Sequence, residues 1–92
     1  MELRRTLKVV NVQGLHARPC HSIVSAALGF QSEVRIRSGP REVNGKSILE
    51  LMTLNAGLGT ELEVRVWGND AAALLTRIEE LFQAGFGEDI ER

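Results

Sequence analysis

Residues 14–19 read Gly-Leu-His-Ala-Arg-Pro, at the point where an alternating apolar pattern ends and a helical pattern begins. Proline suits the first turn of a helix, because its missing N–H would have no partner there, so we expect a helix to begin at about Ala17. The unpaired N–H groups and positive end of that helix would attract an anion beside His16. Arg18 adds a fork of donors that fits phosphate, and histidine offers a neutral nitrogen nucleophile near neutral pH. The stretch therefore predicts a phosphoryl group carried on His16 and bound by Arg18 and the first-turn amides, including that of Ala17.

Outward from this stretch, the spacing of apolar residues predicts strands in alternation with helices. The expected strands cover about residues 3–9, 33–37, 41–43 and 61–66, and the expected helices about residues 17–28, 47–54 and 71–82. Gly29 and Gly85 are each expected to end a helix in the left-handed conformation. Clean alternation in two of the strands leaves one sheet face in water, so all three helices should cover the other face. The pattern predicts a two-layer α+β sandwich, and by itself it does not separate this from a ferredoxin-like fold with an added helix.

Composition limits the possible functions of the chain. Its 92 residues predict a single domain spanning residues 1–92. A net charge of −1, 4% aromatic residues and no tyrosine argue against nucleic-acid binding. No apolar run is long enough to cross a bilayer, and the first residues do not resemble a signal peptide, so we expect a cytoplasmic protein. The single cysteine cannot form an internal disulfide, which fits a reducing compartment.

The other histidine and the cysteine have plainer interpretations than a metal site. His16 and Cys20 lie one helical turn apart, but no cluster of further ligands accompanies them, so we expect no metal and no cofactor. Cys20 is expected to be a small core residue, oxidisable only if it is partly exposed. His21 is expected to point away from His16, toward solvent or a partner.

Two motifs show that the chain resembles HPr, the histidine-containing phosphocarrier of the bacterial phosphotransferase system. The family signature Gly-Leu-His-x-Arg-Pro is present at residues 14–19, and a second motif, Lys-Ser followed by aliphatic residues, is present at residues 46–52. The resemblance covers about residues 3–86. It implies an open-faced βαββαβα sandwich, with a four-stranded antiparallel sheet in the order 1-4-2-3 and three helices on one face.

The resemblance also implies a role in a phosphoryl relay. A member of this family accepts a phosphoryl group from phospho-enzyme I, which takes it from phosphoenolpyruvate, and passes it to an enzyme IIA-type protein. The accepting atom in the family is Nδ1 of the histidine, here His16. Such a protein is a substrate of a phosphotransferase relay rather than an independent catalyst, and it is expected to be a monomer. Residues 81–89 resemble the nitrogen-branch members of the family, so regulation is nearly as plausible as sugar uptake.

Ser47 has a structural interpretation and a regulatory one. With Glu50 it forms the pattern S-x-x-E, which predicts a capping box at the start of the second helix. In some HPr proteins the matching serine is phosphorylated by HPr kinase, so Ser47 is a candidate regulatory site. The resemblance further implies a partner-docking patch, and the residues that we assign to it are Pro19, His21, Ile48, Leu49 and Met52.

Two other functions remain open at this point. One is a regulatory module of a nitrogen-type phosphorelay that acts by protein–protein contact through the same patch. The other is a small-anion-binding domain of ferredoxin-like fold. Phosphoenolpyruvate with enzyme I separates them, because only a phosphocarrier would gain an acid-labile adduct that depends on His16.

Overall fold

The computed structural model describes residues 2–90, in which four strands and three helices follow one another in the expected order. The elements are β1 (Glu2–Lys8), α1 (Ala17–Ala27), β2 (Glu33–Ser38), β3 (Arg41–Asn44), α2 (Ile48–Met52), β4 (Glu61–Trp67), α3 (Ala71–Gln83) and the short 3-10 helix η1 (Gly85–Gly87). The βαββαβα order expected from the sequence is confirmed.

The sheet has the order β1-β4-β2-β3, and every neighbouring pair is antiparallel. In β4, Leu62, Val64 and Val66 are buried, whereas the residues between them lie on the opposite face. That opposite face carries ion pairs between strands, such as Arg37 with Glu63 at 2.9 Å. The sheet is therefore covered on one side only, which confirms the open-faced sandwich.

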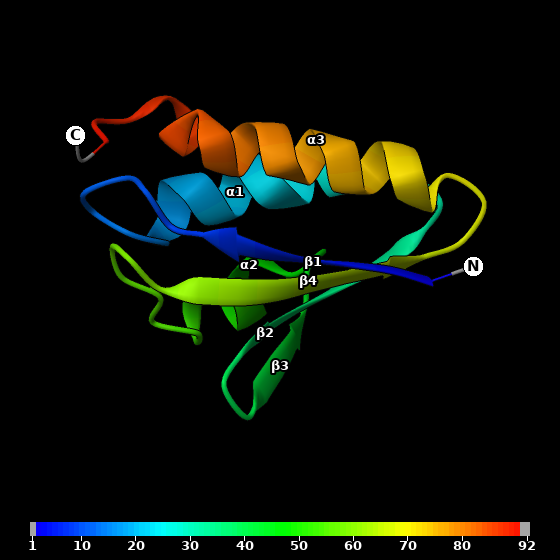
Figure 1. Ribbon diagram of the computed structural model, residues 1–92, viewed down its shortest axis with the longest axis horizontal. Helices are drawn as coiled ribbons and strands as arrows, with labels where there is room; N and C mark the ends of the chain where they lie inside the picture. The colour runs from blue at the N-terminus through cyan, green and yellow to red at the C-terminus, as the bar shows by residue number, and fades with distance from the viewer. Residues whose placement is uncertain (1, 91–92) are drawn as a thin grey trace.

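The helical layer positions the loop that precedes α1. Helix α1 contacts both α2 and α3, and α3 lies across β1 and β4 (Figure 1). The buried side chains of α1 and α3 recur at helical spacing and join the strands in one core, with Ile23, Leu74, Ile78 and Phe82 among its fully enclosed members. Within residues 2–90, no helix has the length and apolar character needed to cross a membrane.

Two expectations about helix ends differ from the structure. Helix α2 ends at Met52 rather than near residue 54, because the N–H groups of Thr53 and Leu54 bond to carbonyls only three residues back. Gly29 is not left-handed: the N–H groups of Gly29 and Phe30 also bond three residues back, and this tighter turn satisfies the last carbonyls of α1 without a left-handed residue. The expectation for Gly85 is confirmed, since its φ is +60°.

Candidate functional site

His16 is the residue immediately before α1, and its backbone is extended with φ −82° and ψ −170°. Its carbonyl accepts the first hydrogen bond of the helix, from the N–H of Cys20 at 3.2 Å. The imidazole makes no capping hydrogen bond to the helix. The ring is therefore free of the helix backbone, and 36% of the side chain is exposed.

Gly14 sets the position of this residue. Its φ of +73° lies in the left-handed region, and a Cβ at this position would lie 2.6 Å from the carbonyl oxygen of Ala56. That same oxygen accepts a hydrogen bond from the N–H of Leu15 at 2.8 Å. The close approach joins the His16 loop to the loop that follows α2.

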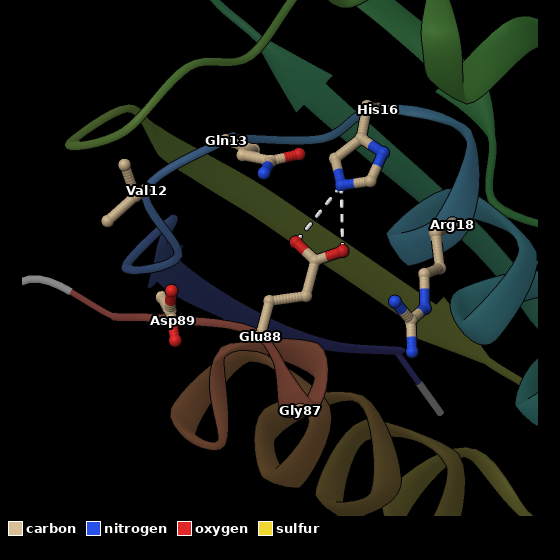
Figure 2. Close-up of a pocket in the computed structure, with 7 residues that line it drawn as sticks. All are labelled: Val12, Gln13, His16, Arg18, Gly87, Glu88 and Asp89. Carbon is tan, nitrogen blue, oxygen red and sulfur yellow. Dashed lines mark hydrogen bonds and ion pairs between the residues drawn. The ribbon is translucent and has the colours of Figure 1, made fainter.

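Glu88 contacts the His16 ring from the other end of the chain. Nε2 of His16 lies 2.8 Å from Oε2 and 3.0 Å from Oε1 of the Glu88 carboxylate (Figure 2). Asn11, which is fully buried, donates from Nδ2 to Oε1 of Glu88 at 3.0 Å and to the carbonyl of Gly14 at 2.8 Å. Asn11 therefore ties the carboxylate to the loop that carries the histidine.

Three successive left-handed residues bring Glu88 to this place. The φ angles of Gly85, Phe86 and Gly87 are +60°, +57° and +77°, so the chain leaves the axis of α3 and turns toward the loop before His16. Phe86 is held in this uncommon conformation by an edge contact of its ring with that of Phe82, at 5.0 Å between centroids. We call residues 85–90 the return segment.

The return segment is fastened to the loop before His16 by backbone contacts. The N–H of Val12 bonds to the carbonyl of Asp89 at 2.9 Å, and Asn11 forms an isolated antiparallel bridge with Ile90. Glu88 is consequently well shielded, with 12% of its side chain exposed. Burial raises the pKa of its carboxyl, but hydrogen bonds from His16 and Asn11 and the charges of His16 and Arg18 outweigh burial, and the net result is a lowered pKa.

Arg18 and the His16 ring line an open hollow beside the return segment. Within residues 2–90, the Arg18 guanidinium forms no hydrogen bond or ion pair. Nδ1 of His16 does not contact Glu88 and lies on the side of the ring turned toward α1 (Figure 2). The hollow is lined by Val12, Gln13, His16, Arg18, Gly87, Glu88 and Asp89.

Comparisons with known proteins agree with this geometry. A family model described as the PTS HPr component phosphorylation site matches residues 3–84. The chain belongs to the HPr family. The family places it among the phosphocarriers of the phosphotransferase system, which supports a phosphocarrier role.

The relatives include proteins named HPr and proteins named NPr. Phosphocarrier protein HPr of Treponema pallidum is 45% identical over 85 residues, which cover 92% of this chain and 97% of that protein. Phosphocarrier protein NPr of Escherichia coli K12 is 31% identical over 90 residues, 97% of this chain and all of that protein. The crystal structure of HPr-C-His from Thermoanaerobacter tengcongensis superposes with a TM-score of 0.91 at 30% identity, covering 96% of this chain and 99% of that one.

The remaining residues singled out from the HPr resemblance lie in different environments. Ala17 is the first residue of α1, and His21 is exposed on the same helix. Leu49 and Met52 are exposed on α2, at 78% and 39%, and Ile48 is half-buried against the core. Pro19 is buried in the first turn of α1, where a proline suits the helix start, and its assignment to the docking patch stays a prediction.

Cys20 is fully buried, as expected for a core residue, and its thiol lies 3.6 Å from the carbonyl of Leu15. Burial raises the pKa of this thiol to about 11, which disfavours the reactive thiolate. Among the described residues 2–90, no three His, Cys, Asp or Glu side chains lie close enough together to hold a metal ion.

Ser47 forms half of the expected capping box. Its hydroxyl accepts from the N–H of Glu50 at 3.2 Å, which caps the start of α2. The reciprocal bond is absent, because the Glu50 carboxylate accepts from the N–H of Asn44 at 3.0 Å, while the N–H of Ser47 bonds to the Asn44 carbonyl. The cap prediction is therefore right for Ser47 and wrong for the carboxylate of Glu50.

Sequence reasoning missed Glu88 and Asn11. The two contacts to Glu88 join residues 72 and 77 positions apart, and no periodicity reports such a pairing. The only local signal was Gly-Phe-Gly at residues 85–87, which predicts a chain reversal just before an acidic residue.

Proposed function

We propose that this member of the HPr family accepts a phosphoryl group on His16 from phospho-enzyme I and passes it to an enzyme IIA-type protein. The observation that carries the proposal is the half-exposed His16 ring at the start of α1, near the guanidinium of Arg18, which has no partner among residues 2–90. In this proposal the chain acts in the cytoplasm as a monomer, and it is a relay substrate rather than a catalyst.

The transfer needs a positioned nucleophile and a positive environment. A lone pair on a ring nitrogen of His16 forms a bond to phosphorus, the bond from phosphorus to the donor atom breaks, and the donor keeps that electron pair. The equatorial oxygens of the transferred phosphoryl group carry negative charge throughout the transfer. The N–H groups of Ala17 and Arg18 at the start of α1 and the guanidinium of Arg18 would stabilise this charge.

The docking patch of the proposal comprises Pro19, His21, Ile48, Leu49 and Met52. Its exposed apolar side chains on α2 are close to the site, because His16 lines a shallow hollow together with residues 55–57, which follow α2 almost directly. Exposed leucine beside a charged site is typical of a protein-docking surface. Leu49→Asp should slow phosphorylation by enzyme I while leaving the thermal unfolding midpoint nearly unchanged.

The central test uses phosphoenolpyruvate and enzyme I with the purified protein. We expect one acid-labile phosphoryl group per chain in the unaltered protein and none in His16→Ala. The matched control is His21→Ala, which removes the other histidine of α1: loss of this docking residue should slow the reaction but leave one phosphoryl group per chain at completion. Uptake that survives His16→Ala would refute the assignment.

Ser47 belongs to the proposal as the acceptor of a regulatory phosphoryl group from HPr kinase. Its half-buried hydroxyl already accepts a hydrogen bond from the helix, and a phosphate there would keep an acceptor at the start of α2. The carboxylate of Glu50 nearby opposes the added charge. Mass spectrometry after incubation with ATP and the kinase tests the role, with Ser47→Ala as control. An unmodified Ser47 removes this role and leaves that of His16 intact.

The similarity to NPr of Escherichia coli favours a second candidate, a regulatory module of a nitrogen-type phosphorelay that acts by protein contact. Transfer rates from the phosphorylated protein to sugar-type and nitrogen-type IIA proteins distinguish the two. If the protein acts by contact alone, the His16→Ala variant should bind the partner as tightly as the unaltered protein does.

A further inference from the structure

We propose that Glu88 is a positioning residue for phosphoryl transfer: it holds the ring proton of His16 on Nε2 and thereby leaves the lone pair of Nδ1 free for the incoming phosphorus. The inference rests on the function proposed above and adds a residue from the opposite end of the chain to it.

The first step of the inference concerns the tautomer of His16. A neutral imidazole carries one N–H, and an ionised carboxylate can only accept hydrogen bonds. Glu88 is ionised at neutral pH, because its pKa lies below the ordinary range, and both of its oxygens lie within 3.0 Å of Nε2. The proton of the neutral ring is therefore on Nε2, and Nδ1 is the unprotonated nitrogen.

The second step concerns rigidity. Asn11 is fully buried and uses one amide group to hold both Glu88 and the Gly14 carbonyl, so the carboxylate and the histidine loop move together. The reverse orientation of this amide would place its oxygen against the carboxylate and against a carbonyl, where it would find no donor. The carboxylate is thus fixed relative to the ring, and Nδ1 is held on the side facing α1 (Figure 2).

The third step concerns charge during the transfer. If Nδ1 forms the bond to phosphorus while the proton stays on Nε2, the ring gains a formal positive charge and the donor leaves with its electron pair. The Glu88 carboxylate faces that charge at 2.8 Å. On transfer to the next acceptor, the Nδ1–phosphorus bond breaks and the neutral ring returns without moving a proton. Glu88 favours the transition state in both directions.

The charged groups around the ring are Glu88, Arg18 and Asp89, which all line the same hollow. Asp89 provides a matched control, because Glu88 and not Asp89 reaches the His16 ring in Figure 2, and no hydrogen bond joins Asp89 to His16 in the described part of the chain. Asp89→Asn removes the same charge one residue further along the return segment.

The test begins with ring nitrogen chemical shifts of His16 in the unphosphorylated protein, at mildly alkaline pH. We expect the ratio of the Nε2–H to the Nδ1–H tautomer to fall about tenfold in Glu88→Ala. This factor corresponds to the weaker hydrogen bonds to a charged group, as is appropriate for a partly exposed pair. Glu88→Gln should restore much of the ratio, because its amide oxygen still accepts from Nε2–H. Asp89→Asn should keep the ratio of the unaltered protein. An equal ratio in Glu88→Ala and the unaltered protein would overturn the proposal.

The second arm measures phosphorylation by enzyme I and phosphoenolpyruvate on variants whose backbone amide spectra show a folded protein. Glu88→Ala should be phosphorylated about tenfold more slowly, and Glu88→Gln should fall between it and the unaltered protein, because the bond is kept and the charge is lost. Unchanged rates would overturn the role of Glu88. If the unaltered protein takes up no phosphoryl group, the proposed function fails, and the tautomer ratio still decides whether Glu88 orients the ring.

Discussion

Replacing Gly14 with alanine should destabilise the protein and displace the His16 loop. The left-handed conformation at φ +73° costs an alanine about 1 to 2 kcal/mol of conformational free energy. Its Cβ would also lie 2.6 Å from the Ala56 oxygen and 2.9 Å from the Gly57 Cα, both backbone atoms that cannot rotate away. Crowding of this kind costs about 1 to 3 kcal/mol. The sum is about 2 to 5 kcal/mol, a large part of the roughly 5 to 14 kcal/mol that stabilises a chain of this length.

Urea unfolding followed by circular dichroism measures the effect. With a slope near 1 kcal/mol per molar urea, the unfolding midpoint of Gly14→Ala should fall by about 2 M or more. The control is Gly39→Ala, where φ is +56° but a Cβ would meet nothing within 4 Å, so that variant pays the conformational cost alone. If Gly14→Ala loses no more stability than Gly39→Ala, the close approach to Ala56 does not constrain the site as described.

Three further predictions follow from single residues. Ser47→Ala should lower the free energy of unfolding by about 1 kcal/mol, measured in urea, because it removes the cap on the N–H of Glu50. The Cys20 thiol should resist a thiol reagent at mildly alkaline pH and react at once when urea is added, because burial raises its pKa to about 11; rapid labelling of the folded protein would contradict its burial. Burial raises the pKa of Glu88, but the bonds and charges of His16, Asn11 and Arg18 outweigh burial, so the net pKa is lowered. The ionised carboxylate therefore stabilises the folded protein at pH values above the ordinary pKa of 4.5, and this stabilisation is lost as the pH falls through the lowered pKa of the folded state. Unfolding midpoints measured from neutral pH down to below 4.5 should therefore fall less steeply for Glu88→Gln than for the unaltered protein, and parallel curves would show that Glu88 is not the group responsible.

Features that depend on neighbouring residues could be predicted from the sequence. Pro19 marked the first turn of α1, and helical spacing located α3, because the chemistry that begins and pairs a helix lies within a few residues. The ends of α1 and α2 were less predictable, because a tight turn with bonds three residues back competes with the left-handed ending that glycine permits.

Features that depend on distant residues could not be predicted from the pattern. The order β1-β4-β2-β3 followed only from the family resemblance, since alternation reports which side of a strand is buried and not which strand lies next to it. The Glu50 carboxylate bonds to the N–H of Asn44, the last residue of β3, while the N–H of Ser47 already bonds to the Asn44 carbonyl. His16 and Arg18 could therefore be predicted from their neighbours in the sequence, whereas Glu88 could not.

The contact between His16 and Glu88 spans 72 positions, and within residues 2–90 it is held by a few hydrogen bonds and by the packing of Phe86 against the core. Opening the return segment would break these bonds and leave the sheet and all three helices intact, so its opening free energy must be far below that of global unfolding. Amide hydrogens of Val12 and Glu88 should accordingly exchange with solvent much sooner than those of β4. Such an opening would give the imidazole a second environment within the same fold, one without the Glu88 carboxylate.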